Sequence, residues 1–139
     1  MHTYFHNRRM ELFRHLPVVI SGLLRDIRGN GSKLLDVGCW DGEFTVKYAQ
    51  VLGTQPGEMH GLDFSTTVLE TARQRGVQAH QVDLEVQTFP FDDNYFDVIV
   101  CNQVLEHLKQ IYIPISEICR VLKEGGVFGN QCSESCGFP

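Results

Sequence analysis

Five short apolar runs along the chain have the length and composition of β-strands. The strongest is FDVIVC at residues 96–101, because valine and isoleucine favour extended backbone. KLLDV at residues 33–37 is typical of a strand that is buried on both faces of a sheet. The predicted strands, in chain order, are residues 33–37, 58–64, 77–84, 96–101 and 127–130.

Amphipathic stretches separate these runs and predict helices. Residues 43–52 carry apolar side chains at helical spacing, and Ser65 has the side chain of an N-cap for a helix that ends near Arg75. A third helix is predicted over residues 112–122, ended by KEGG. Residues 1–30 are predicted to form an N-terminal helical arm, which a proline at position 17 starts, kinks or divides.

Strands that alternate with helices predict an α/β fold: a doubly wound, mostly parallel sheet with helices on both faces. The chain of 139 residues has the size of a single domain, with the arm at 1–30, a core at 33–129 and a tail at 130–139. Ligands of such sheets bind outside the carboxyl ends of the strands. The glycine-containing loop after residue 37 is therefore the first candidate for a binding site.

Composition narrows the class of partner. The net charge of −5 disfavours a nucleic acid as partner, because phosphate binding needs clustered basic residues. No apolar run approaches the ~18 residues of a membrane span, and the first residues lack the apolar stretch of a signal peptide. The cytoplasm is the expected location.

The cysteines and histidines do not predict a metal site. The five cysteines are expected to be thiols, and Cys39, Cys101 and Cys119 lie in or beside apolar segments that suggest packing. Cys132 and Cys136 form a C-x3-C pair without a second pair or a histidine cluster beside it, which makes a zinc site improbable.

Two ligand classes compete for the loop LLDVGCWDGEF at residues 34–44. A dinucleotide-binding loop would read G-x-G-x-x-G, with an acid about 20 residues further on, and Asp63 satisfies the second condition. The loop itself does not match, and its acidic residues would repel a pyrophosphate and attract a cationic ligand. Those acids are Asp36, Asp41 and Glu43.

The motifs of the chain, taken together, resemble those of the class I S-adenosylmethionine-dependent methyltransferases. LLDVGCWDGEF is similar to the first motif of that family, and the further matches are GLDFS at 61–65, VDLE at 82–85, FDVIVCNQVLEHL at 96–108 and RVLKEGGVF at 120–128. The match covers residues 33–129 in the family's order, and the EHL signature resembles the small-molecule branch. The resemblance implies a Rossmann-like sheet of order 3-2-1-4-5, S-adenosylmethionine as cofactor, and methyl transfer to a small-molecule or lipid-like acceptor.

The resemblance also implies which residues bind the cofactor. Asp36 would accept from its amino-acid end, Asp63 from both ribose hydroxyls, and Asp83 from the adenine amino group. The full candidate set is Asp36, Gly38, Cys39, Trp40, Gly42, Asp63, Phe64, Asp83, Leu84 and Asn102. At Gly38 and Gly42 a Cβ would intrude on the ligand.

Each candidate has a purely structural alternative. Asp36 could cap the loop, Asp63 could neighbour a helix N-cap, and Asp83 could belong to a turn. Phe64 and Trp40 could be packing residues. His107 is the one candidate general base, useful for an acceptor hydroxyl, against a structural role at the start of a helix.

The end of the chain departs from the family pattern. Family members continue beyond the fifth strand with a helix and two further strands, whereas VFGNQCSESCGFP ends here in an unrelated sequence. The exposed edge of the fifth strand predicts a homodimer or aggregation. Two alternatives to turnover remain open: a shortened domain that binds the cofactor without methyl transfer, and a nucleotide- or NAD-binding module.

Overall fold

All five strands run parallel in one sheet, in the order β3-β2-β1-β4-β5. This computed structural model describes residues 32–131. The strands are β1 Leu34–Val37, β2 Met59–Asp63, β3 Gln78–Gln81, β4 Phe96–Asn102 and β5 Leu122–Gln131. The predicted fold class and strand order are confirmed, whereas the predicted arm, the tail and the Cys132/Cys136 pair lie outside the described residues.

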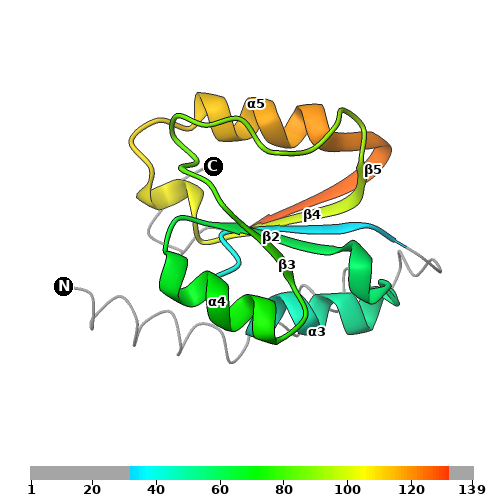
Figure 1. Cartoon of the computed structure of the whole chain (residues 1–139). Coiled ribbons are helices and arrows are strands. Elements are labelled where there is room, and N and C mark those ends of the chain that lie inside the picture. Colours follow the sequence, from blue (N-terminus) through cyan, green and yellow to red (C-terminus); the bar gives the residue numbers. More distant parts are fainter. Residues whose placement is uncertain (1–31, 132–139) are drawn as a thin grey trace.

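Helices cover both faces of this sheet (Figure 1). Helices α3 Glu43–Leu52 and α4 Thr66–Gln74 lie on one face, and α5 Tyr112–Val121 lies on the other. Two 3-10 turns, η1 Pro56–Glu58 and η2 Leu105–His107, complete the described elements. Ser65 stands at the N-cap of α4 as predicted, although its side chain makes no capping hydrogen bond.

Two layers of apolar side chains hold the helices to the sheet. Within β1, Leu34 packs toward α3 and α4, while Leu35 packs toward α5, so that this central strand is buried on both faces as predicted. The layer under α5 contains Ile118 and Val121 and is continued by Phe96 and Ile99 of β4. The sheet is therefore the rigid part of the molecule, and its carboxyl ends carry the loops.

The fifth strand begins earlier than predicted, at Leu122 instead of position 127. The KEGG segment was expected to be a turn, but α5 already ends at Val121 and Leu122 pairs with Phe96. The ladder then shifts register before Val98 pairs with Val127, and Gly125 adopts a φ of 76° there. Residues 123–126 thus stand opposite Asp97 alone, so the expected turn is present as an irregularity within the strand, and the regular ladder begins at Val127 as predicted.

The segment of residues 82–95 links β3 to β4 and lies on the same face of the sheet as α5 (Figure 1). We call it the strap. Arg120 of α5 donates to the backbone carbonyls of Phe89 and Phe91 at 3.0 and 2.8 Å. Glu117 accepts from the amide of Phe89 at 2.8 Å and lies 2.7 Å from Arg120, so that one ion pair of α5 holds the middle of the strap.

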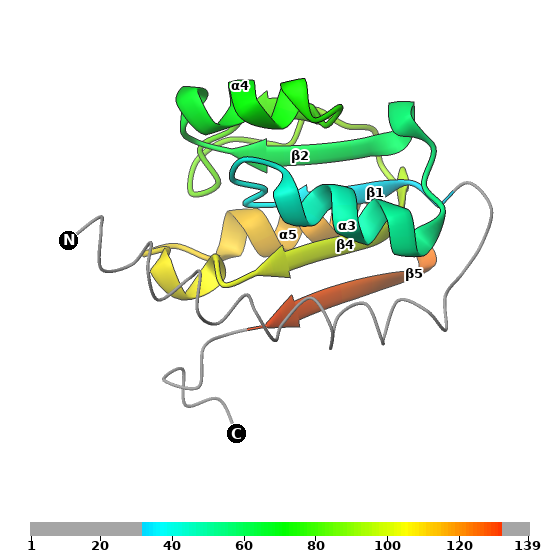
Figure 2. The same cartoon turned by 90° about the horizontal axis from the view of Figure 1, so that it is seen from below.

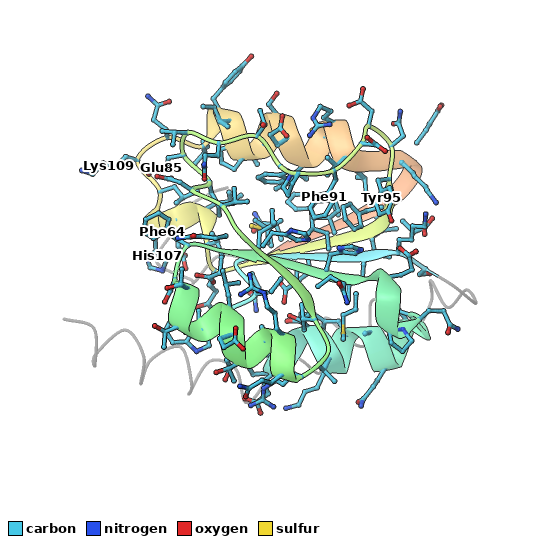
Figure 3. All side chains as sticks on the ribbon, in the orientation of Figure 1. Phe64, Glu85, Phe91, Tyr95, His107 and Lys109 are labelled. Atoms are coloured by element: carbon cyan, nitrogen blue, oxygen red, sulfur yellow. The ribbon has the colours of Figure 1, made fainter. Side chains whose placement is uncertain are left out.

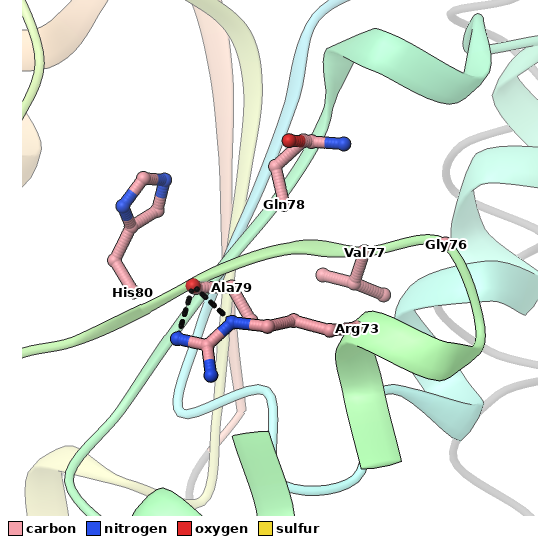
Figure 4. Close-up of a pocket in the computed structure, with 6 residues that line it drawn as sticks. All are labelled: Arg73, Gly76, Val77, Gln78, Ala79 and His80. Carbon is pink, nitrogen blue, oxygen red and sulfur yellow. Dashed lines mark hydrogen bonds between the residues drawn. The ribbon is translucent and has the colours of Figure 1, made fainter. Parts of the chain in front are cut away.

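The outer edge of β3 is covered by a side chain of α4 (Figure 4). Arg73 donates from Nε and Nη2 to the carbonyl oxygen of Ala79, at 3.2 and 2.9 Å. Within residues 32–131, β3 pairs only with β2, and β5 only with β4. An arginine that satisfies an edge carbonyl hinders the addition of another strand, whereas the homodimer expected at the edge of β5 stays a prediction.

Arg73→Ala is expected to make β3 an association site. The carbonyl of Ala79 loses both donors, which costs about 1 kcal/mol and leaves an open strand edge. Sedimentation velocity over a concentration series should show more self-association than for Arg75→Ala, which removes the same charge from an exposed pair with Asp41. Equal association of the two variants would show that Arg73 does not protect this edge.

Candidate functional site

A pocket of about 480 Å³ lies at the carboxyl ends of the strands. Its walls come from the loops after β1, β2, β3 and β4, which the sheet brings to the same side (Figure 2). It is lined by Gly38, Trp40, Asp63, Phe64, Val82, Asp83, Leu84, Glu85, Gln103, Val104, His107, Leu108 and Lys109. This is the place where ligands of parallel α/β sheets bind.

The loop after β1 is tied to the end of β2. The amides of Gly38 and Cys39 both donate to the carbonyl of Leu62, at 2.7 and 2.9 Å, and Trp40 donates to Oδ2 of Asp63 at 3.0 Å. Gly38 and Gly42 both have a φ of 79°, in the left-handed region that favours glycine. The backbone of the loop is therefore fixed before any ligand arrives.

The structure gives the two glycines a second reason besides the predicted close approach of the ligand, which stays a prediction. A Cβ on Gly38 would lie 2.2 Å from Cγ2 of Val104, and a Cβ on Gly42 would lie 2.9 Å from Val77 and 3.1 Å from Ala72. Ligand approach was the expected reason, whereas the first obstacles in the structure are side chains and backbone of the protein itself. Gly38 does line the pocket, while Gly42 does not.

Gly38→Ala is expected to destabilise the fold and distort the pocket wall at once. The added methyl meets Val104 at an impossible distance and the left-handed φ is strained, which together cost about 2 to 4 kcal/mol. Chemical denaturation measures this loss. Gly53→Ala is the matched control, since that glycine has a φ of 68° but nothing within 4 Å of its Cβ, and it should lose about 1 kcal/mol.

Asp63 is held at the end of β2 with its carboxylate at the pocket. Its Oδ1 accepts from the amides of Phe64 and Ser65 at 2.8 and 3.3 Å, while Oδ2 accepts from Trp40. The sequence allowed two roles for Asp63, a ligand contact and a structural role beside the N-cap of α4. The carboxylate is placed for both, because it binds the amides at the start of α4 and also lines the pocket. Beside it, the Phe64 ring lies at the pocket with 65% of its surface exposed.

Asp83 and Leu84 form the beginning of the strap and one wall of the pocket. Oδ1 of Asp83 accepts from the amide of Glu85 at 3.1 Å, and its own amide donates to Gln87 at 2.7 Å. Asp83 therefore has the structural role in a turn that the sequence allowed as an alternative, and its side chain also lines the pocket. Leu84 is buried and adds an apolar surface.

Two acids of the loop after β1, Asp41 and Glu43, lie away from the pocket. Oδ2 of Asp41 lies 3.8 Å from Arg75, and Glu43 pairs with Lys47 at 3.5 Å. Neither acid lines the pocket. The expectation that these acids surround the ligand is wrong, because the left-handed turn at Trp40 and Gly42 directs the loop toward α4.

The acidic character of the pocket comes from other residues. Asp63, Asp83 and Glu85 line it together with the basic side chain of Lys109. The pocket therefore still disfavours a pyrophosphate and suits a ligand with positive charge, although through the ends of β2 and β3 and not through the first loop.

Asp36 and Cys39, two predicted cofactor residues, lie outside the pocket lining. Asp36 is buried, and its Oδ2 accepts from the hydroxyl of Thr45 at 2.6 Å. Cys39 belongs to the core, where a Cβ on Gly61 would lie 2.6 Å from its sulfur. The packing role expected for Cys39 as a small hydrophobic residue agrees with this position better than ligand contact does.

Asn102 ends β4 with an amide side chain that has no hydrogen-bond partner within residues 32–131. Both Oδ1 and Nδ2 are buried, and the residue is 5% exposed. Because an unsatisfied buried amide is costly, it is a position where a polar ligand group would be stabilised. Asn102 itself does not line the pocket, but the next residue, Gln103, does so with a left-handed φ of 54°.

His107 lies in η2 at the pocket (Figure 3). Its Nε2 is 3.5 Å from Oε1 of Glu106, and 56% of its side chain is exposed. Across the pocket, the carboxylate of Glu85 accepts from the backbone amide of Lys109, which joins the strap to the loop after β4. The general base predicted from sequence thus lies at the right place, and its role stays a prediction.

The structure adds lining residues that the sequence reading did not single out. They are Val82, Glu85, Gln103, Val104, Leu108 and Lys109. The motif FDVIVCNQVLEHL contains three of them, so its position after β4 was the available signal. Val82 and Glu85 belong to the motif VDLE, whereas Lys109 carries no such signal, since only the fold brings it to the pocket.

The described residues give no sign of two other classes of site. Residues 32–131 contain no group of three or more histidine, cysteine or acidic side chains arranged to hold a metal ion. In the same range, no helix is both long and apolar enough to cross a membrane.

The pocket fits the cofactor that the sequence resemblance implies. Its volume lies within the range of small-molecule sites. Asp63 and Asp83 present acceptors at the ends of adjacent strands, and the unsatisfied Asn102 amide lies at the end of the next strand but one. These groups can bind hydroxyl, amino and ammonium donors.

Comparison with known proteins identifies the same family. The profile of the methyltransferase domain family matches residues 35–129. Demethylmenaquinone methyltransferase from Staphylococcus epidermidis is 34% identical over 100 residues, which cover 70% of this chain and 41% of that protein. The chain thus spans less than half the length of this curated relative.

Solved structures share the fold. The cyclase SpnF is 30% identical, with a TM-score of 0.67 over 80% of this chain and 43% of that one. A geranyl diphosphate methyltransferase in complex with S-adenosylmethionine is 20% identical, with a TM-score of 0.65 over 81% of this chain and 47% of that one. The chain belongs to the methyltransferase domain family, with the Rossmann-like fold of the S-adenosylmethionine-dependent methyltransferases.

Proposed function

We propose that the pocket binds S-adenosylmethionine and that the protein transfers a methyl group to a small, quinone-like acceptor. The observation that carries this proposal is the pair of carboxylates, Asp63 and Asp83, at the carboxyl ends of adjacent strands in one pocket with the glycine turn of a methyltransferase domain. The cytoplasm, expected from sequence, and a single domain over residues 1–139 are parts of this proposal.

Asp63 would hold the ribose. Its two oxygens are already oriented by the amides of Trp40, Phe64 and Ser65. A carboxylate oxygen has more than one lone pair, so each oxygen can accept a hydroxyl proton in addition. A preoriented acceptor loses little freedom when the ligand binds, which favours tight binding.

Asp83 and Leu84 would hold the adenine. The turn that begins the strap fixes Asp83 through the amide of Glu85, and the pocket residues Leu84 and Phe64 would add apolar surface for the ring. Asn102, which precedes the lining residue Gln103, would offer its amide to the amino-acid part, together with Gly38 of the pocket wall. Trp40, Asp36, Cys39 and Gly42 would act by shaping the loop.

The chemistry asks little of the protein beyond orientation. When bound, S-adenosylmethionine supplies a methyl group on a positively charged sulfur. The acidic lining from Asp63, Asp83 and Glu85 favours that charge. Alignment of the acceptor with the methyl group supplies most of the acceleration, and His107 would remove a proton from an acceptor hydroxyl.

Val104 and Leu108 add apolar surface to the pocket that His107 also lines, and we assign this part of the lining to the acceptor. Apolar surface with a titratable side chain suits a flat, hydroxylated aromatic molecule, and the curated relative named for demethylmenaquinone supports the quinone-like class.

A transfer assay tests this proposal. The 139-residue protein is incubated with methyl-labelled S-adenosylmethionine and a water-soluble naphthoquinol, with catechol and a tRNA pool as other acceptors. Label is expected in the quinol, with His107→Gln slower by at least tenfold. Label in the tRNA instead would refute the acceptor class.

Cofactor binding without methyl transfer is the second candidate. One finding favours it: the solved relative SpnF is named as a cyclase. Binding of S-adenosylmethionine without label in any acceptor would support this candidate. NAD binding, the third alternative from sequence, is opposed by the acidic lining.

A further inference from the structure

Two histidines that the proposed function does not use lie side by side beneath the strap. His60 of β2 and His80 of β3 have nearly parallel rings, 12° apart, with centroids separated by 6.0 Å. Nδ1 and Nε2 of His60 and Nε2 of His80 are buried and have no hydrogen-bond partner in the part of the chain that the structure describes. Buried polar atoms are nearly always paired in proteins, so an unpaired imidazole pair calls for an explanation.

The surroundings of the two rings are aromatic. Phe91 lies 5.3 Å from each imidazole, and Tyr95 lies 6.0 Å from His60, all as distances between ring centroids. Phe91 and Tyr95 belong to the strap, and their rings contact the sheet through these histidines (Figure 3). The second half of the strap therefore rests on the imidazole pair.

The charged groups that face the pair disfavour a further positive charge. Burial and the neighbouring ring of His80 lower the pKa of His60, as does Lys33, while Glu58 opposes them. Burial and Arg73 lower the pKa of His80. One carboxylate thus faces two histidines and two cations, and both rings are neutral at pH 7.

Glu58 is poorly placed to neutralise the pair. Its Oε2 lies 4.0 Å from Nε2 of His60 and already accepts from the hydroxyl of Tyr95 at 3.2 Å. A protonated His60 would carry N–H donors on two buried nitrogens that have no hydrogen-bond partner among the described residues, beside the rings of Phe91 and Tyr95. Movement of the strap would expose this charge to water.

We propose that the strap is an acid-sensitive wall of the pocket, which protonation of His60 or His80 detaches from the sheet. Asp83, Leu84 and Glu85 belong to the strap and line the pocket, so detachment of the strap should weaken ligand binding. This effect on binding rests on the proposed function. The sign follows from linkage: groups that are neutral when buried stabilise the closed strap fully above pH 6.5, and this contribution is lost as the pH falls below that value.

Hydrogen exchange of the protein without cofactor tests the strap itself. The amides of Phe89, Phe91 and Tyr95 bond to Glu117, Phe89 and Val121. Their protection factors, corrected for intrinsic exchange, are expected to fall at least tenfold from pH 7.5 to pH 5.5, whereas β1 keeps its protection. Unchanged protection at pH 5.5 would overturn the proposal.

Variants assign the effect to the two rings. In the double variant His60→Phe with His80→Phe, strap protection should change less than twofold over this pH range, because no titratable ring remains. The pair His60→Gln with His80→Gln should behave likewise if the phenylalanine variant does not fold. His107→Gln is the control and should retain the acid response, and an acid response that persists in both double variants refutes the assignment.

Cofactor affinity separates this proposal from the proposed function. S-adenosylhomocysteine should bind the wild type at least fivefold more weakly at pH 5.5 than at pH 7.5, beyond any change seen with the double variant. Absence of binding at pH 7.5 would contradict the proposed function, while hydrogen exchange would still decide whether the strap opens. Equal pH dependence in wild type and double variant would overturn the link between strap and pocket.

Discussion

Arg120→Met is expected to destabilise the protein by about 3 to 5 kcal/mol, because it leaves the buried carboxylate of Glu117 without its partner. Glu117 is 8% exposed, and Arg120 contacts it at 2.7 Å. The same substitution removes the donors to the carbonyls of Phe89 and Phe91. Urea unfolding, followed by circular dichroism, measures the change.

The double variant Glu117→Gln with Arg120→Met should recover part of this loss. It buries no charge, and glutamine can still accept from the amide of Phe89. Lys123→Met is the control, since it removes a half-exposed pair with Asp97 at 3.1 Å and should cost about 1 kcal/mol or less. A loss for Arg120→Met as small as that of the control would show that the ion pair does not hold the strap.

The ion pair of Glu117 and Arg120 also makes the stability of the fold depend on pH in a direction that can be stated. Hydrogen bonds from Arg120 hold the pKa of Glu117 below its usual value near 4.5. A carboxyl with a lowered pKa in the folded state stabilises the protein above that usual value, and this stability is lost as the pH falls below it. The loss therefore lies at lower pH than the response of the histidine pair, and Glu117→Gln should flatten it.

Asp63→Ala is expected to weaken S-adenosylmethionine binding by about 2 to 3 kcal/mol, which corresponds to roughly 30- to 160-fold in Kd. The two ribose hydroxyls would lose their carboxylate acceptor, and the backbone amide of Trp40 would lose the hydrogen bond that it donates to Asp63. Asp63→Asn should lose less, because one carbonyl acceptor remains. Calorimetric titration measures all three proteins.

Asp41→Ala is the matched control for this prediction. It removes the same charge from the same region of the chain, but Asp41 pairs with Arg75 and does not line the pocket. Its Kd should stay within threefold of the wild type. If Asp41→Ala weakened binding as much as Asp63→Ala, general loop disorder or net charge would explain the effect, and the ribose contact would lose its support.

The strands could be predicted from local composition, and their order could be predicted because the motifs follow one another in the order known for the family. FDVIVC is strand-like by composition alone, and the motif order around Asp63 and Asp83 placed both at strand ends. Side-chain directions could not be predicted in this way. Asp41 and Glu43 turn away from the pocket because of left-handed backbone angles and partners on helices, which a linear sequence does not display.

Other positions could not be predicted because they depend on contacts between segments that are distant in the sequence. Glu85 and Lys109 meet across the pocket although 24 residues separate them, and Arg120 reaches Phe89 from the opposite direction of the chain. Cys39 packs against Gly61 because of the register between β1 and β2. Such positions follow from packing and register and are visible only in the folded structure.

Calorimetric titration of the 139-residue protein with S-adenosylmethionine, S-adenosylhomocysteine and NAD decides whether the pocket is a cofactor site. One site with a micromolar Kd is expected for the two sulfur compounds, and no heat is expected from NAD. A folded protein that binds neither sulfur compound, or that binds NAD instead, would rule out the proposed cofactor.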